Sequence, residues 1–132
     1  MLATPEMEGS FDALGRLARL FSSRVWIVSK AGPRIQRNTE QWLVHHRFFE
    51  RTSILENQVR FVRRRSDKAD VCRELGISHF VDDRAEVLKV LVGIVPHLFL
   101  FGPQDHSVPP FAIHVLTWAQ AEREIEGSVH LD

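Results

Sequence analysis

Residues 77–83 read ISHFVDD, a short apolar run that ends in two carboxylates. The stretch from Ile77 to Val81 has the apolar and aromatic side chains typical of a buried β-strand. Gly76 is well placed to end a helix just before it, and Asp82 and Asp83 stand where the strand would stop. Ligands of parallel α/β sheets bind beyond the carboxyl ends of the strands. The stretch therefore predicts both a strand and a ligand-binding position at its end.

Strand and helix candidates alternate on both sides of this stretch. The expected strands are 25–28, 59–62, 77–81 and 98–101, and the expected helices are 10–21, 33–50, 66–75, 84–95 and 109–126. Apolar residues at helical spacing should face inward, among them Ile35, Trp42, Leu43 and Phe49 in the second helix and Phe111, Val115 and Trp118 in the last. Dense alternation with short connections indicates a three-layer, Rossmann-like α/β fold with a mostly parallel sheet of about four strands.

Composition sets the broad class. With 132 residues, of which 44% are hydrophobic and 26% charged, the chain fits one globular domain, residues 1–132. Within it we expect a loose N-terminal segment over 1–9, and a C-terminal helix and tail over 104–132. Seventeen basic residues balance seventeen acidic ones, which predicts neither a nucleic-acid nor a membrane partner. The single cysteine, Cys72, indicates a reducing, cytoplasmic location.

Polar residues at the strand ends could bind a phosphate and a cation together. Ser29 and Lys30 follow the strand over 25–28 and, with the backbone amides beside them, could bind phosphate oxygens. Lys68, at a helix start, could neutralise phosphate charge. Asp82 and Asp83 are hard oxygen ligands suited to Mg²⁺. Each also has an ordinary structural explanation, since serine favours turns, lysine is usually solvated and aspartate caps helices.

The order of these residues resembles the haloacid-dehalogenase-like (HAD-like) hydrolase superfamily. The string ending in Ser29 is similar to its second motif, Lys68 to the lysine of its third, and 80–84 to its acidic fourth motif. The resemblance implies that Ser29 and Lys68 act at the phosphoryl group. It also implies that Asp82 and Asp83 hold Mg²⁺.

The family's first motif is missing from the sequence. In the family an Asp-x-Asp at the end of the first strand supplies the nucleophile and the general acid/base, and no such motif follows an apolar strand here. Ser29 cannot replace this carboxylate without an adjacent base to activate it. In the family the first strand also lies between the strands that match 25–28 and 77–81. Its loss would leave two strand edges unpaired at the centre of the sheet.

Three explanations are open. In the first, which we favour, the sequence begins at an internal methionine and the missing strand is encoded upstream. Alternatively, the strands over 25–28 and 77–81 pair directly in a smaller, non-catalytic fold. In the third, a protein partner or a second copy covers the open edges by adding a strand.

Two functions remain as expectations. One is a Mg²⁺-dependent phosphohydrolase, acting on a phosphorylated small molecule once the nucleophile strand is supplied. The other is a catalytically inactive HAD-like protein that binds a phosphorylated ligand or a protein partner.

Overall fold

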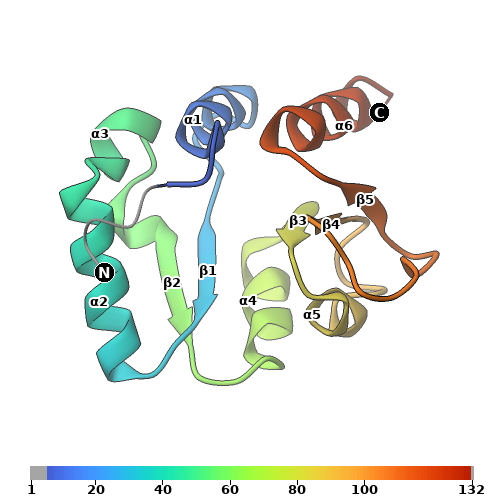
Figure 1. The fold of residues 1–132 in the computed structure, drawn as a ribbon, viewed down its shortest axis with the longest axis horizontal. Helices are drawn as coiled ribbons and strands as arrows, with labels where there is room; N and C mark the ends of the chain where they lie inside the picture. The colour runs from blue at the N-terminus through green and yellow to red at the C-terminus, as the bar shows by residue number, and fades with distance from the viewer. Residues whose placement is uncertain (1–5, 132) are drawn as a thin grey trace. The chain divides into compact units, whose positions relative to one another are not determined.

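The computed structural model describes residues 6–131. The chain divides between Arg63 and Arg64 into two compact units, here called unit 1 and unit 2. In Figure 1, unit 1 runs from blue to green and unit 2 from light green to red. The structure is α/β, and every strand pair in the described residues is parallel. None of the described helices is long and apolar enough to cross a membrane.

Unit 1 contains a two-stranded parallel sheet and a helical core. Its elements are α1 (Ser10–Leu20), β1 (Ile27–Lys30), α2 (Pro33–His45), α3 (Phe48–Thr52), the 3₁₀ turn η1 (Glu56–Gln58) and β2 (Val59–Val62). β1 pairs with β2 in the register Ile27 to Val59. Phe11 of α1 makes edge-to-face contacts with Trp42 and Phe48, at ring-centroid distances of 5.8 and 5.1 Å. Such aromatic contacts add to the stabilisation from burial alone.

The predicted helix over 33–50 is interrupted at His46 and Arg47, and the structure has two helices there. α2 ends at His45, and Arg47, with a φ of 57°, turns the chain before α3 begins. Ile35 is 47% exposed rather than inward, and of the four residues expected inside only Leu43 is fully buried. The turn lets Phe48 reach the aromatic core, an advantage of tertiary packing that local helical spacing does not contain.

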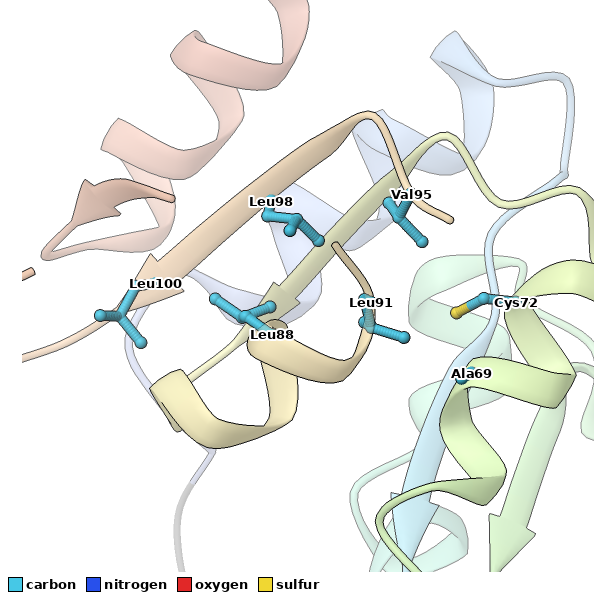
Figure 2. Close-up of a cluster of buried hydrophobic side chains, with 7 residues drawn as sticks. All are labelled: Ala69, Cys72, Leu88, Leu91, Val95, Leu98 and Leu100. Carbon is cyan, nitrogen blue, oxygen red and sulfur yellow. The ribbon is translucent and has the colours of Figure 1, made fainter. Parts of the chain in front are cut away.

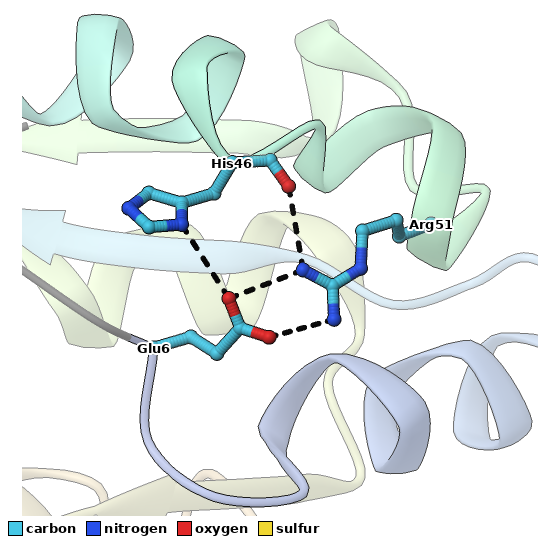
Figure 3. Close-up of polar contacts among 3 residues, drawn as sticks. All are labelled: Glu6, His46 and Arg51. Atoms are coloured by element: carbon cyan, nitrogen blue, oxygen red, sulfur yellow. Dashed lines mark hydrogen bonds and ion pairs between the residues drawn. The ribbon is translucent and has the colours of Figure 1, made fainter. Parts of the chain in front are cut away.

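The N-terminal segment is bound to α2 and α3 at its described end. Glu6 accepts hydrogen bonds from Arg51 at 2.6 and 3.1 Å, and His46 Nδ1 lies 3.5 Å from the same carboxylate (Figure 3). The Arg51 guanidinium also lies 4.5 Å above the Phe11 ring. Of the segment predicted to be loose, residues 1–5 lie outside the described part, and Glu6 is held by these contacts.

Unit 2 contains a three-stranded parallel sheet in the order β3-β4-β5. Its elements are α4 (Asp67–Leu75), β3 (His79–Asp82), α5 (Ala85–Val90), β4 (His97–Phe101), β5 (Ile113–Val115) and α6 (Trp118–Leu131). Four of the five residues of β4 are buried. Leu98 and Leu100 of β4 belong to a core cluster with Leu88 and Leu91, and with Ala69 and Cys72 of α4 (Figure 2). The central strand therefore anchors the hydrophobic core of this unit.

The expected helix over 109–126 begins later, and part of it is a strand. β5 occupies 113–115, where Val115 is fully buried and pairs with Phe101. α6 starts after Thr117, whose hydroxyl accepts a hydrogen bond from the Gln120 N–H at 3.1 Å. Thr-x-x-Gln is a helix-start signature, so the sequence held a signal for this later boundary. Residues 6–131 therefore contain five strands in two sheets, where about four strands in one sheet were expected.

Smaller differences concern the elements around the candidate residues. Strands β1 and β3 start two residues later than expected, so Ser29 lies within β1. Their residues are only partly buried, whereas the strand over 25–28 was expected to be buried on both faces. Gly76 does end α4, at a φ of 65°.

β1 and β3 are edge strands. Within residues 6–131, β1 pairs only with β2, and β3 pairs only with β4. Each of the two strands therefore lies at an edge of the sheet of its own unit.

Candidate functional site

Lys68 and Asp82 form a buried ion pair at the carboxyl end of β3. Lys68 is the second residue of α4, and Asp82 is the last residue of β3. The Lys68 Nζ lies 3.1 Å from Asp82 Oδ2, and the two side chains are only 9% and 10% exposed. α4 and β3 thus bring together two candidate residues that are 14 positions apart in sequence.

The Asp82 carboxylate has a second donor. The backbone N–H of Arg84 donates to its Oδ1 at 2.9 Å, so each of its oxygens accepts one hydrogen bond. Burial raises the pKa of Asp82, while the Lys68 ammonium and the Arg84 N–H act in the opposite direction. The Lys68 Nζ also lies 6.0 Å from the centroid of the Phe80 ring. Lys68 and Arg84 therefore hold the carboxylate in a fixed position at the strand end.

Asp83 has a different environment. Its residue is exposed, and its backbone carbonyl accepts a hydrogen bond from Gln104 Nε2 at 3.1 Å. The same nitrogen donates to the carbonyl of Phe101 at 3.2 Å. Gln104 therefore ties the loop after β3 to the end of β4, and the Asp83 carboxylate remains accessible to a cation.

Gln104 was not among the predicted site residues. It follows Gly102 and Pro103 directly after β4, so the rule that chemistry gathers at the carboxyl ends of strands could have pointed to it. Its role in joining two loops could not be read from sequence, because the partners are backbone carbonyls.

The other predicted residues, Ser29 and Lys30, belong to unit 1, where they are the last two residues of β1. Ser29 is partly buried and pairs with Phe61 of β2, and Lys30 is exposed. Lys68, Asp82 and Asp83, in contrast, all belong to unit 2.

The ligand set for a metal is small. Within the described residues, no group of three or more histidine, cysteine, aspartate or glutamate side chains is arranged to hold a metal ion. Asp82 and Asp83 fit a Mg²⁺ ion that takes one or two carboxylates from the protein and its other ligands from substrate phosphate and water. Asp83 would supply the accessible carboxylate, and Asp82 would keep its bond to Lys68.

The basic run 63–65 is engaged within the chain. Arg63 donates to the Ala31 carbonyl, Arg64 pairs with Asp67 at 3.2 Å, and the Arg65 guanidinium lies 3.8 Å from Glu86. Each of the three arginines therefore has a carbonyl or carboxylate partner within the chain.

Comparison with known proteins gives no family assignment: no protein-family model matches the chain, and no curated protein is significantly similar to it.

Proposed function

We propose that this chain is a HAD-like phosphohydrolase-type domain that carries the cation-binding and charge-neutralising part of a phosphate-ester site. The observation that carries the proposal is the Lys68–Asp82 pair, in which Nζ and Oδ2 lie 3.1 Å apart at the carboxyl end of β3. The resemblance matched these two residues to its third and fourth motifs separately, and the fold makes them neighbours.

Each residue has a distinct role in this proposal. Lys68 neutralises charge on the phosphoryl group while it orients Asp82. Asp83, with Asp82 beside it, binds Mg²⁺, which would polarise a phosphoryl oxygen. The resemblance gives Ser29 a phosphate contact, and Lys30 is a candidate beside it; both lie in unit 1. Hydrolysis requires in addition the carboxylate nucleophile of a strand supplied from outside residues 6–131.

The second candidate function is a catalytically inactive HAD-like domain that binds a phosphorylated ligand or a protein partner. One observation favours it: the sequence has no Asp-x-Asp at a strand end, so no residue in it matches the family's nucleophile. Binding through Lys68, Asp82 and Asp83 does not require that residue.

Phosphatase assay of the purified chain separates the two candidates. The chain is incubated with p-nitrophenyl phosphate and Mg²⁺, beside the double variant Asp82→Asn/Asp83→Asn. Asp105→Asn is the matched control, because Asp105 is an exposed aspartate of the same unit. Turnover that is lost in the double variant and kept in the control supports hydrolysis.

Binding measurements complete the test. Calorimetric titration with Mg²⁺ and with inorganic phosphate is made on the same three proteins. Binding without turnover, lost in the double variant only, supports the second candidate. A chain that neither turns over substrate nor binds Mg²⁺ or phosphate contradicts the ligand-binding part of both candidates.

A further inference from the structure

The carboxyl end of β4 is firmly held in the sheet of unit 2. β4 lies between β3 and β5, and its last residue, Phe101, pairs with Val115 of β5. The buried Gly102 follows: its N–H donates to the Val115 carbonyl at 2.8 Å, and its own carbonyl accepts a hydrogen bond from His114 Nε2 at 2.6 Å. The backbone at 101–102 is therefore a fixed support for the residues that contact it.

The turn after β4 returns Gln104 to this support. Gly102 has a φ of 85°, which glycine adopts without strain, and the ring of Pro103 fixes the next φ. The Gln104 side chain then donates from Nε2 to the Phe101 carbonyl, three residues back, at 3.2 Å. The sequence Gly-Pro-Gln thus places an amide group at the end of the central strand.

The same amide nitrogen also contacts the loop after β3. It donates to the Asp83 carbonyl at 3.1 Å, so its two hydrogens serve two carbonyl oxygens. Because both partners are acceptors, the nitrogen of the amide must face them, and its oxygen cannot. Gln104 therefore fixes the backbone of Asp83, a residue that belongs neither to β3 nor to α5.

The loop after β3 is held at three points. Lys68 and the Arg84 N–H each bond one carboxylate oxygen of Asp82. The third point is the bond from Gln104 to the Asp83 backbone. Asp83 is exposed, so the position of its carboxylate depends on the backbone that carries it. Of the two aspartates, Asp82 is fixed through its side chain and Asp83 through Gln104.

We propose that Gln104 is a positioning residue that keeps Asp83 in place beside Asp82, so that this strand end binds Mg²⁺ in preference to Ca²⁺. Mg²⁺ demands near-ideal octahedral geometry at about 2.0–2.1 Å, whereas Ca²⁺ accepts variable geometry at about 2.3–2.6 Å. A carboxylate held in place can meet the strict geometry of Mg²⁺, while a loosened one still suits Ca²⁺. The inference rests on the cation site of the proposed function and adds to it the residue that selects the ion.

Metal titrations test this role. The full chain and Gln104→Met, which has a side chain of similar length but no donor, are titrated calorimetrically with Mg²⁺ and with Ca²⁺. The wild type should bind Mg²⁺ more tightly. In Gln104→Met the Mg²⁺ affinity should fall about tenfold, as when a metal ligand loses a supporting hydrogen bond, and the Ca²⁺ affinity much less. Gln120→Met is the matched control, because Gln120 also bonds a backbone group of unit 2, the Leu116 N–H near the start of α6.

Gln104→Glu separates positioning from charge. Glutamate has nearly the same shape, but at neutral pH its carboxylate cannot donate to the two carbonyl oxygens. The added negative charge attracts both divalent ions alike, so the ratio of the Mg²⁺ and Ca²⁺ affinities reports the positioning. This ratio should fall in Gln104→Glu as in Gln104→Met and stay at the wild-type value in Gln120→Met. If Gln104→Met fails to fold, as circular dichroism would show, Gln104→Glu provides the test.

Amide hydrogen exchange without metal distinguishes this inference from the proposed function. The Arg84 N–H, bonded to Asp82 Oδ1, should exchange about tenfold faster in Gln104→Met, the equivalent of one lost hydrogen bond, and at the wild-type rate in Gln120→Met. Unchanged exchange, or an unchanged affinity ratio in a chain that binds Mg²⁺, overturns the role of Gln104 and leaves the cation site in place. A wild type that binds neither ion overturns the cation site and the ion preference together.

Discussion

The two units differ in which residue types adopt the left-handed backbone conformation, with φ above zero. In unit 1, positive φ values occur at Ser22, Ser23, Arg47 and Ser53, beside Gly9. In the described part of unit 2 every such position is a glycine: Gly76, Gly93 and Gly102. The left-handed conformation costs a side-chain-bearing residue roughly 1–2 kcal/mol, and glycine avoids this cost. Unit 2 therefore has the residues that its turns require, whereas tertiary packing holds several turns of unit 1 in place.

In unit 2 the glycines suit their turns, but the buried charges of Lys68 and Asp82 depend on each other. Lys68→Met should lower the free energy of unfolding by about 3–5 kcal/mol, because it leaves a buried carboxylate without its partner. The pKa of Asp82 should rise further in this variant, since the Lys68 ammonium opposes the effect of burial. Urea unfolding measures the first effect, and carboxyl ¹³C NMR of Asp82 across a pH titration measures the second.

The double variant Lys68→Met/Asp82→Leu is the control for this prediction. It should recover most of the lost stability, because two apolar side chains can replace a buried ion pair at little cost. Cys72 gives a local readout: it belongs to the core cluster of unit 2, and burial raises the pKa of its thiol to about 11. Its labelling by a thiol reagent should therefore follow the opening of unit 2. Equal stability of the single and double variants would show that the pair does not hold this unit together.

The next effect tests the glycines of unit 2 directly. Gly76→Ala should destabilise the protein by about 1 kcal/mol, because alanine at a φ of 65° carries the left-handed strain, partly offset by a less flexible unfolded chain. No atom lies within 4 Å of the added Cβ, so steric overlap should not contribute. The measurement is the urea midpoint, with Gly127→Ala in α6 as a control in which helix propensity should favour alanine. If Gly76→Ala is as stable as the wild type, the difference between the two units that we infer is wrong.

The same contrast explains how much of the fold the sequence predicted. Gly76 marked the end of α4 because only glycine adopts its conformation freely, and the strand over 59–62 was confirmed in full. The break at Arg47 was missed because arginine gives no such signal and the apolar spacing continues through it. The strand over 113–115 was missed because Val115 fits a helical spacing as well as a buried strand position.

The candidate site was predictable to a similar extent. The rule for strand ends selected Asp82 and Asp83, and Lys68 stood out through its position at a helix start. The contact between Lys68 and Asp82 could not be derived from spacing, because it depends on how α4 packs beside β3. The division of roles between Asp82, which is held by Lys68 and Arg84, and the exposed Asp83 likewise comes only from the three-dimensional arrangement.

A glycine introduced into unit 1 should stabilise the protein, whereas the loss of Gly76 from unit 2 should destabilise it. Ser53, with a φ of 67°, follows α3 at a position where helices commonly end in glycine. Ser53→Gly should stabilise the protein by about 0.5 kcal/mol, since the relief of strain slightly exceeds the added flexibility of the unfolded chain. Thermal unfolding beside Ser107→Gly, an exposed serine outside the helices and strands of unit 2, makes the comparison. A lower melting temperature for Ser53→Gly would show that its side chain matters more than its backbone.

The smallest effect concerns the contact of Glu6 with Arg51 at the surface of unit 1. The hydrogen bond from Arg51 lowers the pKa of Glu6 below its ordinary value of 4.5. A lowered acid pKa stabilises the fold above the unfolded-state value, and this contribution disappears as the pH falls through the folded-state value. Glu6→Gln should therefore melt slightly earlier than the wild type at pH 6, and the difference should vanish near pH 3 and shrink in 1 M salt. Glu8→Gln, in the same segment, is the matched control variant. Because Arg51 is exposed and Lys68 is buried, a pH-dependent loss in Glu6→Gln as large as that of Lys68→Met would reverse the ranking of the two ion pairs.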